Sequence, residues 1–284
     1  MRTIKLKDGS KVSKLGIGTY RIGSNPSKRE EEMKAFRYAL DFGVNLIDTA
    51  EMYGNGDSEE FVGEAIKPYE REDLYLISKF VPSNASKKRL EKSLDASLRR
   101  LDTDYLDLYM YHWPGSTPLE ETVSELVRLQ EAGKIKAWGV SSFDTTDMKK
   151  LLALPNGTDC VVNQLYYNLS ERGIEYELKP LLDQHQITTM AYSPLIKGGQ
   201  AKHNLLSNPV LKEIAEELGV TVYQVLLLFT LHQENIIPIP KASSFEHMKA
   251  NCECLNLSFT DEQFQKLDQE FPAPEHATSL ALGW

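Results

Sequence analysis

Short apolar runs alternate with longer amphipathic stretches along almost the whole chain. The apolar runs predict eight buried strands, at residues 15–18, 44–48, 74–79, 105–112, 135–141, 161–164, 187–193 and 236–241. A helix is expected after each strand, and extra helices are expected late in the chain. This alternation is typical of βα units arranged around a parallel sheet.

Local signals place the turns and the starts of the helices. Asp8 and Gly9 predict a hairpin turn near the N-terminus. Residues 29–42 carry apolar side chains on one face and are followed by a glycine, as expected where a helix ends. Three threonines stand three residues before Glu or Gln, which is the spacing of a capping box. Helix caps are therefore predicted at Ser86, Thr117, Asp144, Thr221 and Thr260.

Eight βα units in a chain of 284 residues predict an α/β fold of the (β/α)8 class, the TIM barrel, preceded by the N-terminal hairpin. No low-complexity segment or long linker divides the chain, so residues 1–284 are expected to form a single barrel domain. The alternative is a doubly wound open sheet. That fold usually has a glycine-rich turn after its first strand, and here only Gly16 and Gly18 stand there.

Composition narrows the classes of partner. The formal net charge of −9 argues against a nucleic-acid or membrane surface, so an anionic ligand must be held by local cations or backbone donors. Cys160, Cys252 and Cys254 give neither a disulfide framework nor a zinc pattern, and no metal is expected. The sequence has no signal-peptide core and no long apolar run, which predicts a cytoplasmic protein. A monomer is expected, because no obvious assembly helix is present.

Every predicted strand from the second onward ends in side chains that can hydrogen-bond, stack or change protonation. Taken singly, most have an ordinary explanation, since an aspartate can cap a turn, a histidine can lie in the core and a lysine can lie in a solvated loop. In a parallel barrel, however, the strand ends meet at the face where barrel enzymes work. The residues concerned are Asp48, Tyr53 in the loop that follows it, Lys79, His112, Trp113, Ser141, Ser142, Asn163, Gln164, Tyr192, Ser193 and Lys241.

Lys79 is the hardest of these to explain as an ordinary surface residue. It directly follows the apolar run LYLIS, so its ammonium group is expected to be partly desolvated. Lysines are rarely buried without a partner, and Asp48 at the end of the adjacent strand is the natural one. An ammonium beside Tyr53 is expected to lower the pKa of that phenol from about 10 by roughly one to three units. The three residues therefore predict a device for proton transfer.

The other strand-end residues suit a reaction on a carbonyl group. His112 can donate a hydrogen bond to a carbonyl oxygen, and Tyr192 can stack on a flat heterocycle. Ser141 and Gln164 can bond an amide. Together they fit reversible carbonyl reduction with an aromatic, amide-bearing hydride carrier. The sequence has no HExxH motif, no nucleophile elbow and no GxxxxGK[ST] phosphate loop.

The sequence resembles the aldo-keto reductases over almost its whole length. The resemblance is carried by the motifs GVNLIDTAEMYGNGDSEEFVGEAI, LISKF, LDLYMYHWP, GKIKAWGVSSF, VVNQLYYN, AYSPL and IPIPKASSFEHMKAN. It implies a catalytic tetrad of Asp48, Tyr53, Lys79 and His112. In that tetrad Tyr53 is the proton donor, Lys79 and Asp48 tune it, and His112 orients the substrate carbonyl.

The same resemblance implies NADP(H) as the cofactor, with NAD(H) as a second possibility, and a small-molecule carbonyl substrate. The segment 193–197 would cover the pyrophosphate, and Lys241 would face the 2′-phosphate. The implied cofactor-binding residues are Gly18, Thr19, Tyr20, Asp48, Ser141, Ser142, Gln164, Tyr192, Ser193, Leu195, Lys197, Lys241, Ser243, His247 and Asn251. The implied substrate-binding residues are Tyr20, Tyr53, His112 and Trp113.

The sequence departs from the family pattern at three of these positions. Ser142 stands where the family usually has asparagine, which weakens one amide contact. His247 replaces the usual phosphate-gripping arginine, and a histidine is mostly neutral at pH 7 and lacks the guanidinium fork. The strand-end lysine still favours NADP(H), and NAD(H) stays the second possibility. Tyr20 stands where tryptophan is common, and with Trp113 it is expected to shape an aromatic substrate pocket.

The sequence leaves three functions open. The first is NADP(H)-dependent reduction of aldehydes or ketones to alcohols, which the full tetrad favours. The second is a nicotinamide-binding regulatory or scaffold subunit without significant turnover, because fold does not fix function. The third is a metal-dependent barrel isomerase or hydrolase, although the strand ends carry no histidine–carboxylate cluster suited to a metal.

Overall fold

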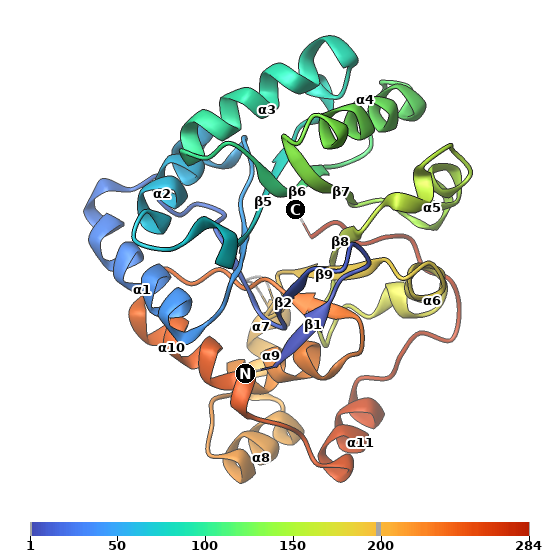
Figure 1. Ribbon diagram of the computed structural model, residues 1–284. Helices are drawn as coiled ribbons and strands as arrows, with labels where there is room; N and C mark the ends of the chain where they lie inside the picture. The colour runs from blue at the N-terminus through green and yellow to red at the C-terminus, as the bar shows by residue number, and fades with distance from the viewer. Residues whose placement is uncertain (1, 197–199, 284) are drawn as a thin grey trace.

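The structure, a computed structural model, describes residues 2–196 and 200–283. Eight parallel strands follow one another around a nearly closed barrel in chain order (Figure 1). The first and last strands meet where Gly18 bridges Lys241 and its amide donates to the Pro240 carbonyl at 3.1 Å. The strands are β3 (Gly16–Gly18), β4 (Leu46–Asp48), β5 (Tyr75–Phe80), β6 (Leu106–Tyr111), β7 (Ile135–Ser141), β8 (Val162–Tyr166), β9 (Thr188–Tyr192) and β10 (Ile236–Pro238).

Each strand lies within a few residues of a predicted apolar run, so the (β/α)8 barrel is confirmed and the open doubly wound sheet is wrong. Figure 1 shows the helices as a ring around the strands. In the described part of the chain no single helix is long and apolar enough to cross a membrane, and α8 and α9 reach that length only as a pair bent by 87°. The helices are α1 (Arg29–Phe42), α2 (Asp57–Ile66), α3 (Lys87–Leu101), α4 (Leu119–Glu131), α5 (Thr145–Leu152), α6 (Leu178–Gln184), α7 (Gln200–Ser207), α8 (Pro209–Leu218), α9 (Val222–His232), α10 (Phe245–Glu253) and α11 (Asp261–Glu270).

The N-terminal hairpin closes the amino end of the barrel. Its strands β1 (Thr3–Lys5) and β2 (Lys11–Ser13) pair antiparallel, and Gly9 takes the left-handed conformation at φ 91° that the predicted turn requires. Leu6 and Val12 belong to the same apolar cluster as the inward-facing side chains of the barrel strands, and both are almost fully buried. The carboxyl end of the barrel is therefore the end left for a site.

Three of the five predicted helix caps are confirmed. Asp144 accepts a hydrogen bond from the Asp147 amide at 2.8 Å, and the threonines before α9 and α11 each form a complete capping box. The capping box at Thr117 is wrong, because Pro118 has the extended ψ of 127° and α4 begins one residue later than expected. Ser86 occupies the N-cap position of α3, but its side chain makes no capping hydrogen bond.

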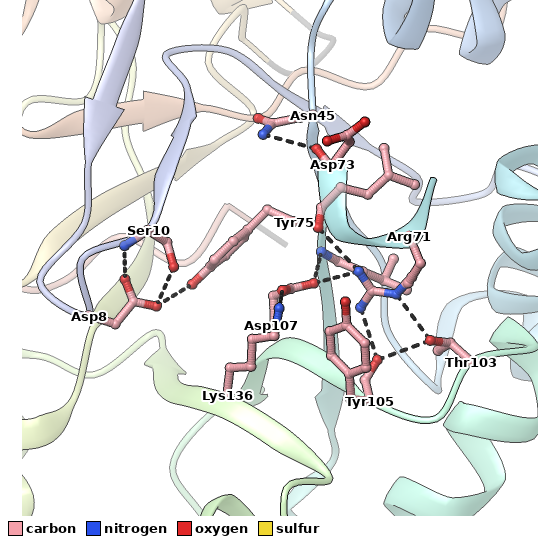
Figure 2. Close-up of polar contacts among 12 residues, drawn as sticks. Asp8, Ser10, Asn45, Arg71, Asp73, Tyr75, Thr103, Tyr105, Asp107 and Lys136 are labelled. Carbon is pink, nitrogen blue, oxygen red and sulfur yellow. Dashed lines mark hydrogen bonds and ion pairs between the residues drawn. The ribbon is translucent and has the colours of Figure 1, made fainter. Parts of the chain in front are cut away.

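A polar network ties the strands together at the amino end of the barrel (Figure 2). Asp107 of β6 is 3% exposed and accepts a hydrogen bond from the Leu76 amide of β5 at 2.9 Å. It also pairs with Arg71 at 2.8 Å and with Lys136 at 3.0 Å. Both cations lie against the ring of Tyr105, at 4.1 and 4.3 Å from its centroid. One carboxylate thus links three strands and the segment before β5.

We expect Asp107→Asn to lower the free energy of unfolding by about 3 kcal/mol, because it leaves the mostly buried Arg71 without its counter-charge. Urea denaturation with an unchanged m-value measures the effect. The control is Asp102→Asn, whose pair with Lys67 is exposed on both sides and contributes less than about 1 kcal/mol. Equal effects of the two substitutions would contradict a stabilising role for the buried network.

Candidate active site

A cavity of about 580 Å³ opens at the carboxyl ends of the barrel strands. It collects most of the strand-end residues that the sequence singled out, but Ser142 and Asn163 do not line it. It also takes in Met52 and Ile239, which sequence reasoning missed. Lys79 lies beneath the cavity and is fully buried. The lining residues predicted from the sequence are Gly18, Thr19, Tyr20, Asp48, Tyr53, His112, Trp113, Ser141, Gln164, Tyr192, Ser193 and Lys241.

Lys79 and Asp48 form the buried ion pair at the centre of the site. The Lys79 ammonium lies 2.8 Å from Oδ1 and 2.9 Å from Oδ2 of Asp48. It also donates to the Thr49 carbonyl at 2.8 Å and to the Tyr53 hydroxyl at 3.3 Å. Asp48 Oδ1 accepts a further hydrogen bond from Gln164 Nε2 at 2.8 Å. Every donor of the ammonium thus has an acceptor, which is what a buried lysine requires.

Tyr53 enters the cavity from the segment that follows β4. Enclosure of its hydroxyl raises the pKa of Tyr53 well above 10, and the carboxylate of Asp48 and the neighbouring Tyr20 raise it further. The expected lowering of this pKa is therefore wrong, because desolvation of the hydroxyl is the largest of these effects and acts in the opposite direction. Burial also lowers the pKa of Lys79, and Asp48 opposes that change. The phenol consequently keeps its proton at neutral pH.

His112 lines the cavity beside Tyr53, and the two rings pack edge to face. The two rings are 5.7 Å apart and nearly perpendicular, at 72°. Burial, with a smaller contribution from the Lys79 charge, lowers the pKa of His112 to about 2. Within the described residues, Nδ1 of His112 is buried and has no hydrogen-bond partner. A neutral imidazole beside the phenol hydroxyl of Tyr53 can therefore orient a polar group that enters the cavity.

The turn after Tyr53 explains how the phenol reaches its position. Gly54, Asn55 and Gly56 all take positive φ angles, from 54° to 105°, so the chain reverses within one tight turn before α2. A Cβ atom at Gly54 would come within 2.3 Å of Ser24 Oγ, and one at Gly56 within 2.6 Å of the Arg100 side chain. The glycines of the YGNG sequence are therefore needed for this turn.

The side chains predicted to bind the nicotinamide lie on adjacent strand ends. Ser141 of β7 and Gln164 of β8 are register partners and both are buried. The amide nitrogen of Gln164 is engaged by Asp48, so Gln164 also supports the ion pair. Ser142 and Ser193 follow their strands with positive φ angles of 58° and 50°. Such strained positions are common at ligand-binding sites.

Tyr192 lies at the end of β9 beneath the C-terminal tail. Its ring stacks with that of Tyr166 at 5.6 Å, with an angle of 30° between the planes. Its hydroxyl donates to the carbonyl of Leu282. The tail therefore lies beside the ring that was expected to stack on a heterocycle.

The residues predicted for the phosphate end lie outside the cavity, except for Lys241. Ser243 is half-buried, His247 is exposed in the first turn of α10, and Asn251 is buried in the same helix. Leu195 is half-buried and packs against the core, and Ser142 does not line the cavity. Lys197 falls outside the described residues.

Lys241 is not the only cation at this edge of the barrel. Burial lowers the pKa of Lys241, the nearby carboxylate of Glu32 opposes this change, and the charges of Lys28 and Arg21 add to it. Sequence reasoning missed Arg21 and Lys28, which both lie in the connection between β3 and α1. The signal that could have found them is their position in the first βα loop, since such loops form the working face of a barrel.

Comparison with known proteins places this geometry in a family. The model of the Aldo/keto reductase family matches residues 14–270. The chain is 42% identical over 268 residues to methylglyoxal reductase YeaE of Escherichia coli, and the match covers 94% of each chain. It is 33% identical to glyoxal reductase of Bacillus subtilis, and that match covers 94% of this chain and 91% of the other. The crystal structure of an aldo/keto reductase from Klebsiella pneumoniae in complex with NADP and acetate superposes with a TM-score of 0.95, at 39% identity and 99% coverage of both chains. The chain belongs to the aldo/keto reductase family.

Proposed function

We propose that this aldo/keto reductase reduces small aldehydes or ketones to alcohols with NADP(H), and that Tyr53 donates the proton. The observation that carries the proposal is the buried Lys79–Asp48 pair, which lies 3.3 Å below the Tyr53 hydroxyl at the mouth of the barrel. Two similar proteins, named methylglyoxal reductase and glyoxal reductase, support the proposed reaction.

The cavity fits a nicotinamide cofactor at one end and a carbonyl compound at the other. Ser141 and Gln164 offer hydrogen-bonding groups to the carboxamide, and Tyr192 offers a flat ring. Lys241 offers its charge to the 2′-phosphate of NADP(H). When bound, this cofactor supplies the hydride. The solved Klebsiella pneumoniae relatives, which are complexes with NADP and with NADPH, support the choice of cofactor.

The chain's own residues manage the proton. Tyr53 holds it on the phenol oxygen, because the raised pKa keeps the phenol protonated at neutral pH. As the substrate oxygen gains negative charge, Tyr53 gives it the proton, and the Lys79 ammonium stabilises the phenolate that remains. Asp48 keeps the ammonium in place. Neutral His112 donates a hydrogen bond to the substrate oxygen and fixes its direction.

The mouth of the cavity suits small carbonyl compounds with an apolar or planar part. Tyr20 is 52% exposed and contacts Tyr53 edge-on at 5.2 Å, and Met52 is 43% exposed. Trp113 packs beside His112 at 4.9 Å.

We also propose that the enzyme works as a cytoplasmic monomer, that residues 1–284 act as one barrel domain, and that nucleic acids and membranes are not its partners.

We expect Tyr53→Phe to lower the rate of aldehyde reduction by about 10²–10⁴-fold, because the proton donor is lost. The dissociation constant of NADPH should stay within about twofold, since the phenol makes no essential cofactor contact. NADPH consumption and fluorescence titration measure the two effects, with the exposed Tyr176→Phe as the control. Undiminished turnover in Tyr53→Phe would end this mechanism. Tight NADPH binding by the wild-type protein without turnover of any aldehyde would instead support a regulatory subunit.

Lys241→Met should raise the Michaelis constant for NADPH by about ten- to a hundredfold, because a charge-assisted phosphate contact is worth about 1.5–3 kcal/mol. The constant for NADH, which has no 2′-phosphate, should change by about twofold or less. The control is Lys249→Met, which removes an exposed lysine of α10. Equal losses with NADPH and NADH would show that Lys241 does not read the 2′-phosphate.

His112 should not titrate between pH 5 and 8 in the folded protein, because its pKa is lowered to about 2. Since the unfolded chain binds this proton near pH 6.5, the stability contributed by neutral His112 is complete above pH 6.5 and declines as the pH falls from there toward 2. NMR of the assigned imidazole signals tests this, with the urea-unfolded chain as the reference. A midpoint near 6.5 in the folded protein would contradict a neutral His112.

A further inference from the structure

Glu51 lies between two members of the tetrad, three residues after Asp48 and two before Tyr53, and its carboxylate is held entirely by neutral donors. Its Oε1 accepts from the Val81 amide at 2.7 Å and from Asn84 Nδ2 at 2.9 Å. Its Oε2 accepts from the Ser93 hydroxyl of α3. Within the described residues no lysine or arginine forms an ion pair with it. The carboxylate therefore joins the segment that bears Tyr53 to the loop and helix that follow β5.

The backbone shows why a side chain is needed at this position. Past the end of β4, the amides of Thr49 and Glu51 continue the pairing with β5 by donating to the carbonyls of Ile77 and Lys79 at 3.1 and 3.2 Å. The chain then turns away, since the Tyr53 amide donates to the Ala50 carbonyl at 3.0 Å. Beyond Glu51 the backbone no longer pairs with the segment that follows β5. The side chain of Glu51 accepts the next hydrogen bond instead, from the Val81 amide.

The hydrogen bond between Glu51 and Val81 lies close in the chain to both Tyr53 and Lys79, whose side chains contact each other. Lys79 stands two residues before Val81, and Tyr53 stands two residues after Glu51. The bond between Glu51 and Val81 therefore fixes the two segments whose side chains meet at the Tyr53 hydroxyl and the Lys79 ammonium. That contact, at 3.3 Å, is the longest made by the ammonium, whose other partners lie at 2.8–2.9 Å. It is the contact that depends most on the placement of the backbone.

We propose that Glu51 is a positioning residue for carbonyl reduction, which holds the phenol of Tyr53 against the ammonium of Lys79. This inference rests on the proposed function. Glu51 does not touch the cavity and acts through the two segments that it joins. Because a displacement of about 1 Å at a reacting group can cost about a hundredfold in rate, loss of this link affects the chemical step more than binding.

Two substitutions separate the link from the charge. Glu51→Ala removes all three hydrogen bonds. Glu51→Gln keeps an oxygen for Val81 and Asn84, and its NH2 group can donate to the Ser93 hydroxyl, which is both donor and acceptor. The matched control is Glu64→Ala, since Glu64 is an exposed glutamate of α2 whose partner Arg29 is also partly exposed. Each protein is assayed well below its melting temperature, with a reactive aldehyde and saturating NADPH.

For Glu51→Ala we expect kcat to fall about ten- to a hundredfold, while the KM for the aldehyde and the Kd of NADPH change by less than about threefold. The solvent isotope effect on kcat should rise, because transfer of the Tyr53 proton becomes slower than the other steps. Glu51→Gln should recover at least about a third of the wild-type kcat. A crystal structure of Glu51→Ala should show the Tyr53 hydroxyl displaced from the Lys79 ammonium.

Three results would overturn the proposal. One is a folded Glu51→Ala protein with wild-type kcat and an unchanged solvent isotope effect. Another is an equal loss in Glu51→Gln, which would assign the effect to the charge. The third is a loss of kcat matched by equal losses of NADPH binding and melting temperature, which would mark a purely structural role. A wild-type protein without aldehyde turnover would instead defeat the proposed function, and the Tyr53–Lys79 distance in the Glu51→Ala structure would still test the link.

Discussion

The site depends on the burial of one ammonium group, that of Lys79. Removing a charge from water costs several kcal/mol, and only a counter-charge with complete hydrogen bonding offsets that cost. Asp48 supplies the counter-charge, and the Thr49 carbonyl and Tyr53 hydroxyl accept the remaining hydrogen bonds. Gln164 in turn occupies the other side of Asp48. The groups that offset the cost of burying this charge thus include the Tyr53 hydroxyl, which lines the cavity.

The network that links the strands lies at the amino end of the barrel, and the cavity lies at the carboxyl end. At the amino end, the hairpin and the network around Asp107 close the barrel and link neighbouring strands (Figure 2). At the carboxyl end, the strands stop beneath a cavity, and the segment after β4 turns Tyr53 into it. Because the strands are parallel, residues far apart in the sequence, such as Asp48 and Gln164, reach the same rim.

Much of the site could be predicted because it follows from strand ends. In a parallel barrel, residues at the ends of the apolar runs all lie at the carboxyl-terminal face. This argument predicts that Asp48, Lys79 and His112 lie together there. Caps that depend on a side chain and the next turn of helix, as at Asp144, were also predicted correctly. The cap at Thr117 was not, because the backbone angle of Pro118 moved the start of the helix by one residue.

What the sequence determined by itself was the order of the strands, the face at which they end and the residue types gathered there, because periodicity and strand direction are local properties. The tertiary structure alone decided the direction of the Tyr53 pKa shift, because desolvation depends on what encloses the hydroxyl and not on its neighbours in the chain. It alone also brought Glu51 to Val81 and Ser93, and Arg21 and Lys28 towards Lys241. These contacts join different βα units, so no spacing within one unit encodes them.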